Sequence, residues 1–121
     1  MEISVAVPVY PTESPEKVKK ALENVFPSLT FTLLEKGFTG TGQDIETLNK
    51  MKLLLENQRI RDTAQEILTR SVLSQTLTFS LNKQAAYMGK INFSDECPLD
   101  PIVVSITDED IHSIITYLSG T

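Results

Sequence analysis

The sequence contains one cysteine, one histidine and no long apolar run, and each scarcity excludes a class of protein. A lone Cys97 forms no disulfide within the chain, so a disulfide scaffold is excluded. No stretch approaches the ~18 apolar residues of a membrane span. A signal peptide has a basic region followed by a long apolar region, and the first residues of this sequence carry neither. We therefore expect a cytoplasmic protein that does not use a membrane as its partner.

Side chains suited to catalysis are equally scarce. A nucleophile–histidine arrangement would have to use His112, which falls on the polar side of a predicted helix. Cys97 follows two acidic residues, an unfavourable setting for a reactive thiolate. The acidic run at 108–110 suits the positive end of a helix dipole. No set of ligands has zinc spacing. We predict that the protein is not an enzyme and that it uses no metal and no cofactor.

The apolar residues that are present predict one α+β domain over 1–121. They make up 40% of the chain, and charged residues make up 22%, as in typical globular proteins. Alternation predicts strands at 3–9, 29–33, 77–81, 91–93 and 102–106, and helical spacing predicts helices at 14–25, 43–73 and 107–118. The helical region 43–73 is either two helices or one helix broken near Asn57. The order β-α-β-(αα)-β-β-β-α favours a two-layer α+β sandwich.

Proline and glycine give two further expectations. Pro8 cannot donate a hydrogen bond, so the first strand is predicted to lie at an edge of the sheet or to end there. The stretch 37–42 contains three glycines between a predicted strand and a predicted helix, and we interpret it as a loop. Backbone amides in such a loop can hold a phosphate, but the spacing matches no phosphate-binding motif.

Charge is distributed unevenly along the chain, although the net charge is only -5. Residues 1–49 carry four basic and seven acidic groups, residues 50–90 carry seven basic and three acidic groups, and residues 91–121 carry six acidic groups and no basic group. All three arginines fall in the middle block. This segregation either marks a site for an anionic partner or disappears when the blocks interleave in the fold.

Within the middle block, the predicted helix 59–70 places several polar side chains at helical spacing. One face of this helix is predicted to carry Arg59, Thr63, Glu66 and Arg70. Arg61 points to another side of the helix. Two arginines on one face can contact phosphates bidentately. The alternative is a solvated face on which Glu66 and Arg70 form an ordinary ion pair.

The segment 82–92 joins two predicted strands and is rich in amide and basic side chains. Hydrogen bonds to bases or phosphates can come from Asn82, Lys83, Gln84 and Lys90. The ring of Tyr87 can stack on a base. The alternative is a structural loop in which the amide side chains satisfy nearby backbone groups.

Three segments carry a resemblance to a known family: VYPTESPEKV at 9–18, RIRDTA at 59–64 and FSLNKQAAYMGKINF at 79–93. The chain resembles a small archaeal family of uncharacterised proteins. The resemblance implies a fold similar to that of the large-subunit ribosomal protein that binds 5S ribosomal RNA. It also implies an RNA-binding role.

We therefore predict an RNA-binding module. Its phosphate-contacting residues are Arg59, Arg61, Arg70, Lys83 and Lys90, and its base- or sugar-facing residues are Asn82, Gln84 and Tyr87. The alternative is an interaction domain without nucleic acid, a homodimer in which the strand at 2–8 pairs across a two-fold axis.

Overall fold

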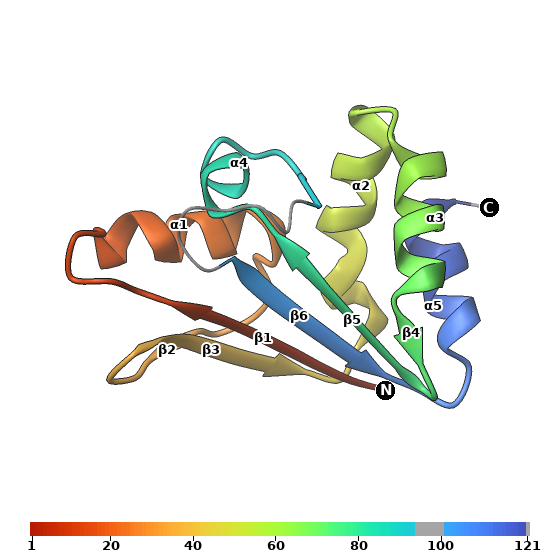
Figure 1. Cartoon of the computed structure of the whole chain (residues 1–121), viewed down its shortest axis with the longest axis horizontal. Coiled ribbons are helices and arrows are strands. Elements are labelled where there is room, and N and C mark those ends of the chain that lie inside the picture. The colour runs from red at the N-terminus through yellow and green to blue at the C-terminus, as the bar shows by residue number, and fades with distance from the viewer. Residues whose placement is uncertain (94–100, 121) are drawn as a thin grey trace.

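A six-stranded antiparallel sheet forms one layer of the protein, and the helices pack against one of its faces (Figure 1). The computed structural model describes residues 1–93 and 101–120. The strands are β1 (Glu2–Pro8), β2 (Thr32–Leu33), β3 (Gly37–Gly42), β4 (Val72–Leu73), β5 (Thr76–Leu81) and β6 (Ile102–Thr107), in the spatial order β2-β3-β1-β6-β5-β4. The predicted α+β class is confirmed. Both edge strands have only two residues, which limits the edge available for pairing with other chains.

The helices gather over the two ends of the sheet (Figure 1). They are α1 (Pro15–Val25), α2 (Asn49–Asn57), α3 (Arg61–Arg70), α4 (Lys83–Tyr87) and α5 (Ile111–Ser119), with a 3-10 turn η1 (Ile45–Leu48) before α2. α1 and α4 cover one end, and α2, α3 and α5 cover the other. As predicted, Ser14 caps α1 by accepting a hydrogen bond from the Lys17 amide, and the long helical region breaks after Asn57. The last helix begins later than predicted, with Asp110 as its cap.

The core lies between the sheet and the helices because the apolar positions of neighbouring strands are in register. Val5 lies opposite Val104, and Val104 lies opposite Phe79 on the next strand. All three side chains are at most 4% exposed. The helices close this layer with their own apolar stripes, such as Leu22 of α1 and Leu68 of α3. The alternation that predicted the strands therefore also predicted the buried face of the sheet.

Within residues 1–93 and 101–120, no helix covers the opposite face of the sheet (Figure 1), which carries mostly small hydroxyl side chains. By register, it presents Ser4, Thr32, Thr39, Thr41, Thr76, Thr78, Ser80, Ser105 and Thr107, together with Glu2, Ala6, Leu73 and Val103. Two of the hydroxyl pairs lie within hydrogen-bond distance across strands, Thr76 with Thr107 at 3.1 Å and Thr78 with Ser105 at 3.2 Å. This face is nearly uncharged, and its hydroxyl groups lie beside the exposed apolar side chains of Leu73 and Val103.

Of the two expectations drawn from Pro8, an edge position for the first strand is wrong, whereas an end of the strand at Pro8 is confirmed, because β1 runs from Glu2 to Pro8. β1 lies between β3 and β6, and β6 pairs with it only from Glu2 to Ala6. Pro8 lies beyond that ladder, so its missing N–H removes no hydrogen bond from it. A central strand offers no free edge, and the homodimer by pairing of this strand loses its structural basis.

The interpretation of 37–42 as a loop is also wrong, because these residues form β3. Glycine is required there by close packing rather than by a turn. A Cβ on Gly37 would overlap the Val7 carbonyl oxygen, and a Cβ on Gly40 would lie 2.8 Å from the Phe31 ring. The remaining differences are smaller. The predicted strand at 91–93 is not a strand, the strand at 29–33 shortens to β2, and a short helix, α4, forms after β5.

Candidate nucleic-acid interface

The uncovered sheet face is a poor platform for RNA bases. Many sheet-based RNA-binding modules stack bases on aromatic side chains that project from the strands. Among the described strand residues, those that face outward include no aromatic and no basic side chain, and Glu2 is their one charge. A nucleic-acid contact is therefore better sought on the helical layer, where the candidate residues lie.

α4 forms because its first residue is capped and its end is turned by glycine. The Asn82 side chain accepts a hydrogen bond from the Ala85 amide at 2.9 Å. After the helix, Gly89 adopts a φ of 76°, a conformation that costs glycine little. From α1, the Asn24 side chain donates to the carbonyl oxygens of Ala86 and Tyr87, each at 3.0 Å. The amide oxygen of Asn82 therefore accepts a hydrogen bond from the backbone. This agrees with the alternative prediction for this segment, in which amide side chains satisfy nearby backbone groups.

On one side of α4, the segment that follows it is tied to the corner between α2 and α3. The Gln58 side chain accepts from the Ile91 amide at 2.7 Å and donates to the Ile91 carbonyl oxygen at 2.9 Å. A hollow of about 390 Å³ lies at this contact and is lined by Gln58, Thr63, Ala85 and Lys90 among others. The exposed Arg59 lies next to Gln58, with a φ of 58° that turns the chain toward α3. The two segments predicted from sequence therefore meet in space.

The Gln58 contact has a testable effect on stability. Replacing Gln58 by alanine removes both hydrogen bonds to Ile91 and is expected to lower the free energy of unfolding by about 1–3 kcal/mol. Urea denaturation followed by circular dichroism measures this change. Gln65→Ala is the control, because Gln65 lies exposed on α3. Equal midpoints for the two variants would show that the contact does not hold the segment in place.

On the other side of α4, a groove of about 520 Å³ separates this helix from α1. Lys17 of α1 and Gln84, Tyr87 and Met88 line it. The Lys20 ammonium lies 5.3 Å from the centroid of the Tyr87 ring. Sequence reasoning missed Lys17 and Lys20. Their i,i+3 spacing on a predicted helix was the available signal, since it places both on one face.

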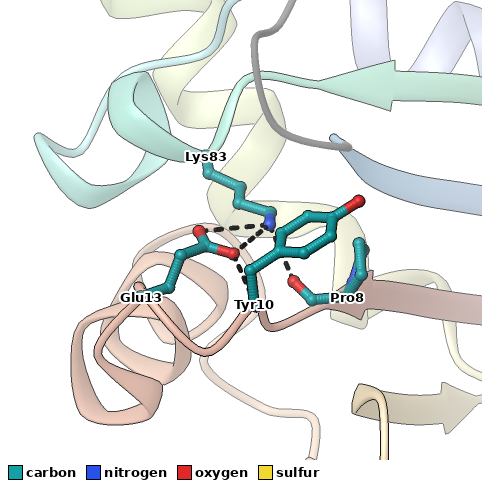
Figure 2. A network of polar contacts seen from close by, with 4 residues as sticks. All are labelled: Pro8, Tyr10, Glu13 and Lys83. Atoms are coloured by element: carbon teal, nitrogen blue, oxygen red, sulfur yellow. Dashed lines mark hydrogen bonds and ion pairs between the residues drawn. The ribbon is translucent and has the colours of Figure 1, made fainter.

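Lys83 is not available to a phosphate, because its ammonium is already paired inside the protein (Figure 2). It donates to the Pro8 carbonyl oxygen at 2.7 Å and to the two Glu13 carboxylate oxygens at 3.0 and 3.2 Å. The residue is 5% exposed, and its ammonium lies 5.4 Å from the centroid of the Tyr10 ring. Glu13 also accepts a hydrogen bond from the Tyr10 amide. This geometry gives Lys83 a structural role and removes it from the predicted phosphate contacts.

The arginines do not form one cluster. Arg59 precedes α3, so it does not share a helical face with Arg70 as predicted. Arg61 begins α3 and lies against Gly120 at the carboxyl end of α5, where a cation is favourable. Arg70 ends α3, about 14 Å along the helix axis from Arg61. Glu66 and Arg70 are both exposed and form no ion pair within the part of the chain that the structure describes.

Metal binding and membrane insertion find no structural support in residues 1–93 and 101–120. No group of three or more histidine, cysteine, aspartate or glutamate side chains there is placed to hold a metal ion. Cys97 lies outside these residues. Of the helices described, none has both the length and the apolar character needed to cross a membrane.

Comparison with known proteins gives the family. A family model described as RNA binding matches residues 2–107. The UPF0201 protein of Thermococcus onnurineus is 36% identical over 122 residues, covering 98% of this chain and 90% of the relative. The UPF0201 protein of Methanothermobacter thermautotrophicus is 38% identical over 120 residues, with the same coverage of both chains. This chain belongs to the UPF0201 family.

The fold of this UPF0201 chain agrees with a solved relative. A crystal structure of the UPF0201 protein from Methanococcus jannaschii superposes with a TM-score of 0.90 at 35% identity, covering 100% of this chain and 94% of that one. The predicted membership of an archaeal family is confirmed. For UPF0201, the family model supports a role in RNA binding at a general level.

Proposed function

We propose that this protein is an RNA-binding module that contacts RNA across α4 and the two hollows on either side of it. The observation that carries the proposal is the position of α4. It lies between the groove against α1 and the hollow at the α2–α3 corner. Basic side chains stand on both sides, Lys17 and Lys20 on α1 and Lys90 and Arg59 near the corner. The description of the family as RNA binding supports the same function.

The charge distribution supports a local footprint, that is, a small set of cations that contact phosphates, rather than a general attraction of the protein to nucleic acid. The net charge of -5 opposes nonspecific binding, so affinity depends on the few cations that reach phosphates. Lys83 and Glu13 neutralise each other within the groove. Arg61 and Arg70 fall outside this footprint, one beside α5 and the other at the far end of α3. The footprint that we propose therefore consists of Lys17, Lys20, Arg59 and Lys90.

Salt dependence tests the footprint. Four phosphate contacts to single-stranded RNA give a slope of log K against log salt of about -3, or about a fifty-fold loss of affinity between about 50 and 200 mM salt. Lys20→Ala is expected to reduce this slope by about 0.7. Fluorescence anisotropy with labelled cellular RNA across a salt series measures the slope.

Two matched variants control for charge. Lys19→Ala removes an exposed lysine one residue away on another side of α1, and Arg70→Ala removes an exposed arginine at the far end of α3. Both should leave the slope unchanged. If they reduce it as much as Lys20→Ala does, binding follows overall charge and the footprint is wrong. If no RNA binds at low salt, the proposed function is wrong.

A further inference from the structure

The groove between α1 and α4 has the size and chemistry of a small-molecule site. Its volume of about 520 Å³ falls in the range of 300–1,000 Å³ typical of ligand pockets. Apolar groups from Val18, Ala21 and Met88 form much of its wall, and the polar groups of Gln84 and Lys17 lie among them. Met88 is 72% exposed, although it is a large apolar side chain. An apolar wall with a few hydrogen-bonding groups suits a flat heterocycle better than it suits a phosphate alone.

Counted over the described residues, the groove is also positively charged once its internal ion pair is allowed for. Among the described residues that line it, Glu13 is the one acid, and Lys83 pairs with it at 3.0 Å. Lys17 in the wall and Lys20 beside Tyr87 remain exposed and free of ion pairs among the described residues. A ligand with an apolar ring and an attached anion matches this arrangement. A nucleotide has both parts.

One face of the Tyr87 ring lies beneath the side chain of Lys20. The lysine is exposed, and its ammonium lies 5.3 Å from the ring centroid, so the protein core does not cover that face. A base stacked there would replace the ammonium over the ring. The displaced Lys20 would then be free to pair with the phosphate that adjoins the base.

We propose that this groove binds one unpaired nucleotide of single-stranded RNA, with its base against Tyr87 and its phosphate at Lys17 and Lys20. This inference rests on the proposed RNA-binding function and adds the class of RNA. A base held in a duplex is stacked and paired and presents no free ring face to a side chain. The protein therefore discriminates single strands from duplexes at this groove.

The test compares Tyr87 with a tyrosine in a similar setting. Tyr117 on α5 is also partly buried and also has a lysine over its ring, Lys52 at 4.7 Å from the centroid. Tyr87→Leu is expected to weaken binding of a short labelled single-stranded RNA by about 5- to 150-fold, because it removes base stacking. Tyr87→Phe and Tyr117→Leu should bind like the unaltered protein. The salt slope of Tyr87→Leu should not change, since stacking releases no counterions.

A second measurement compares different forms of RNA on the unaltered protein and is read together with the salt slope of Lys20→Ala. The unaltered protein is titrated with the single strand, with the same sequence as a duplex, and with an abasic strand that keeps only sugar and phosphate. We expect the duplex and the abasic strand to bind at least about fivefold more weakly than the single strand, by the stacking contribution. Equal binding of all three, with the slope still sensitive to Lys20→Ala, would overturn the nucleotide site and leave the proposed function intact. Absence of binding to every RNA would overturn both.

Discussion

Replacing Lys83 by methionine is expected to lower the free energy of unfolding by about 3–5 kcal/mol. The ammonium of Lys83 pairs with both carboxylate oxygens of Glu13 and donates to the Pro8 carbonyl oxygen. The side chains of Lys83 and Glu13 are only 6% and 12% exposed, so water cannot replace the lost partner fully. The variant leaves a largely buried carboxylate and a carbonyl oxygen without that donor. Domains of this size have stabilities of about 5–15 kcal/mol, so the loss is a large fraction of the total.

Urea denaturation of Lys83→Met, followed by circular dichroism, measures this effect. Lys90→Met is the matched control, because it makes the same change at an exposed position and should alter the free energy by less than about 0.5 kcal/mol. Adding Glu13→Gln to Lys83→Met removes the unpaired charge and should recover part of the loss. Equal stabilities for Lys83→Met and Lys90→Met would contradict a stabilising role for the buried pair.

Gly37→Ala is expected to destabilise the protein by about 3 kcal/mol, a large effect for one methyl group. The added Cβ would overlap the Val7 carbonyl oxygen and lie 2.7 Å from the Pro8 Cα. Both atoms belong to the backbone of the central strand β1, so no side-chain rotation relieves the overlap. The strands must separate at this pair, and the end of the β1–β3 ladder weakens.

Thermal and urea unfolding compare this variant with Gly89→Ala. Gly89 has open space around the position of a Cβ but a φ of 76°, so alanine there costs about 1–2 kcal/mol through its backbone alone. We therefore expect Gly37→Ala to be the least stable of the three proteins, Gly89→Ala to be intermediate and the unaltered protein to be the most stable. A Gly37→Ala variant that is as stable as Gly89→Ala would show that β1 and β3 adjust to the extra atom.

The fold class could be predicted because the apolar pattern is regular. The alternation at Ile3, Val5 and Val7 identifies both the strand and its buried face. Ser14 before Pro15 marks the start of α1 through capping chemistry that acts over three residues. Local signals of this kind are strong because they do not depend on distant partners.

The errors concern features that distant packing decides. Gly37 and Gly40 resemble a loop in sequence, but they lie in a strand because the Val7 carbonyl and the Phe31 ring leave no room for a side chain. Pro8 suggests an edge strand, but the β6 ladder ends before it reaches Pro8. α4 has five residues, too few for a period to be recognised.

The candidate site was predicted only in part, because packing between distant segments also decides which residues it contains. Composition identified the segment 82–92 and the region around Arg59, which lie close to one another in the structure. The burial of Lys83 could not be foreseen, because its partner Glu13 is 70 residues away and lysine is rarely buried. Lys17 and Lys20 were missed because only the fold brings α1 beside α4.

The position of β1 in the sheet affects how the protein is made. Glu2 pairs with Thr107, so the strand that leaves the ribosome early waits for one of the last elements to be translated. At 5–20 residues per second, that interval is about 5–20 seconds. During it, β1 can pair with β3 on one side while its other edge has no native partner. A strand with apolar side chains and an unpaired backbone edge favours aggregation. We therefore expect the nascent chain to need protection from other chains until β6 has emerged.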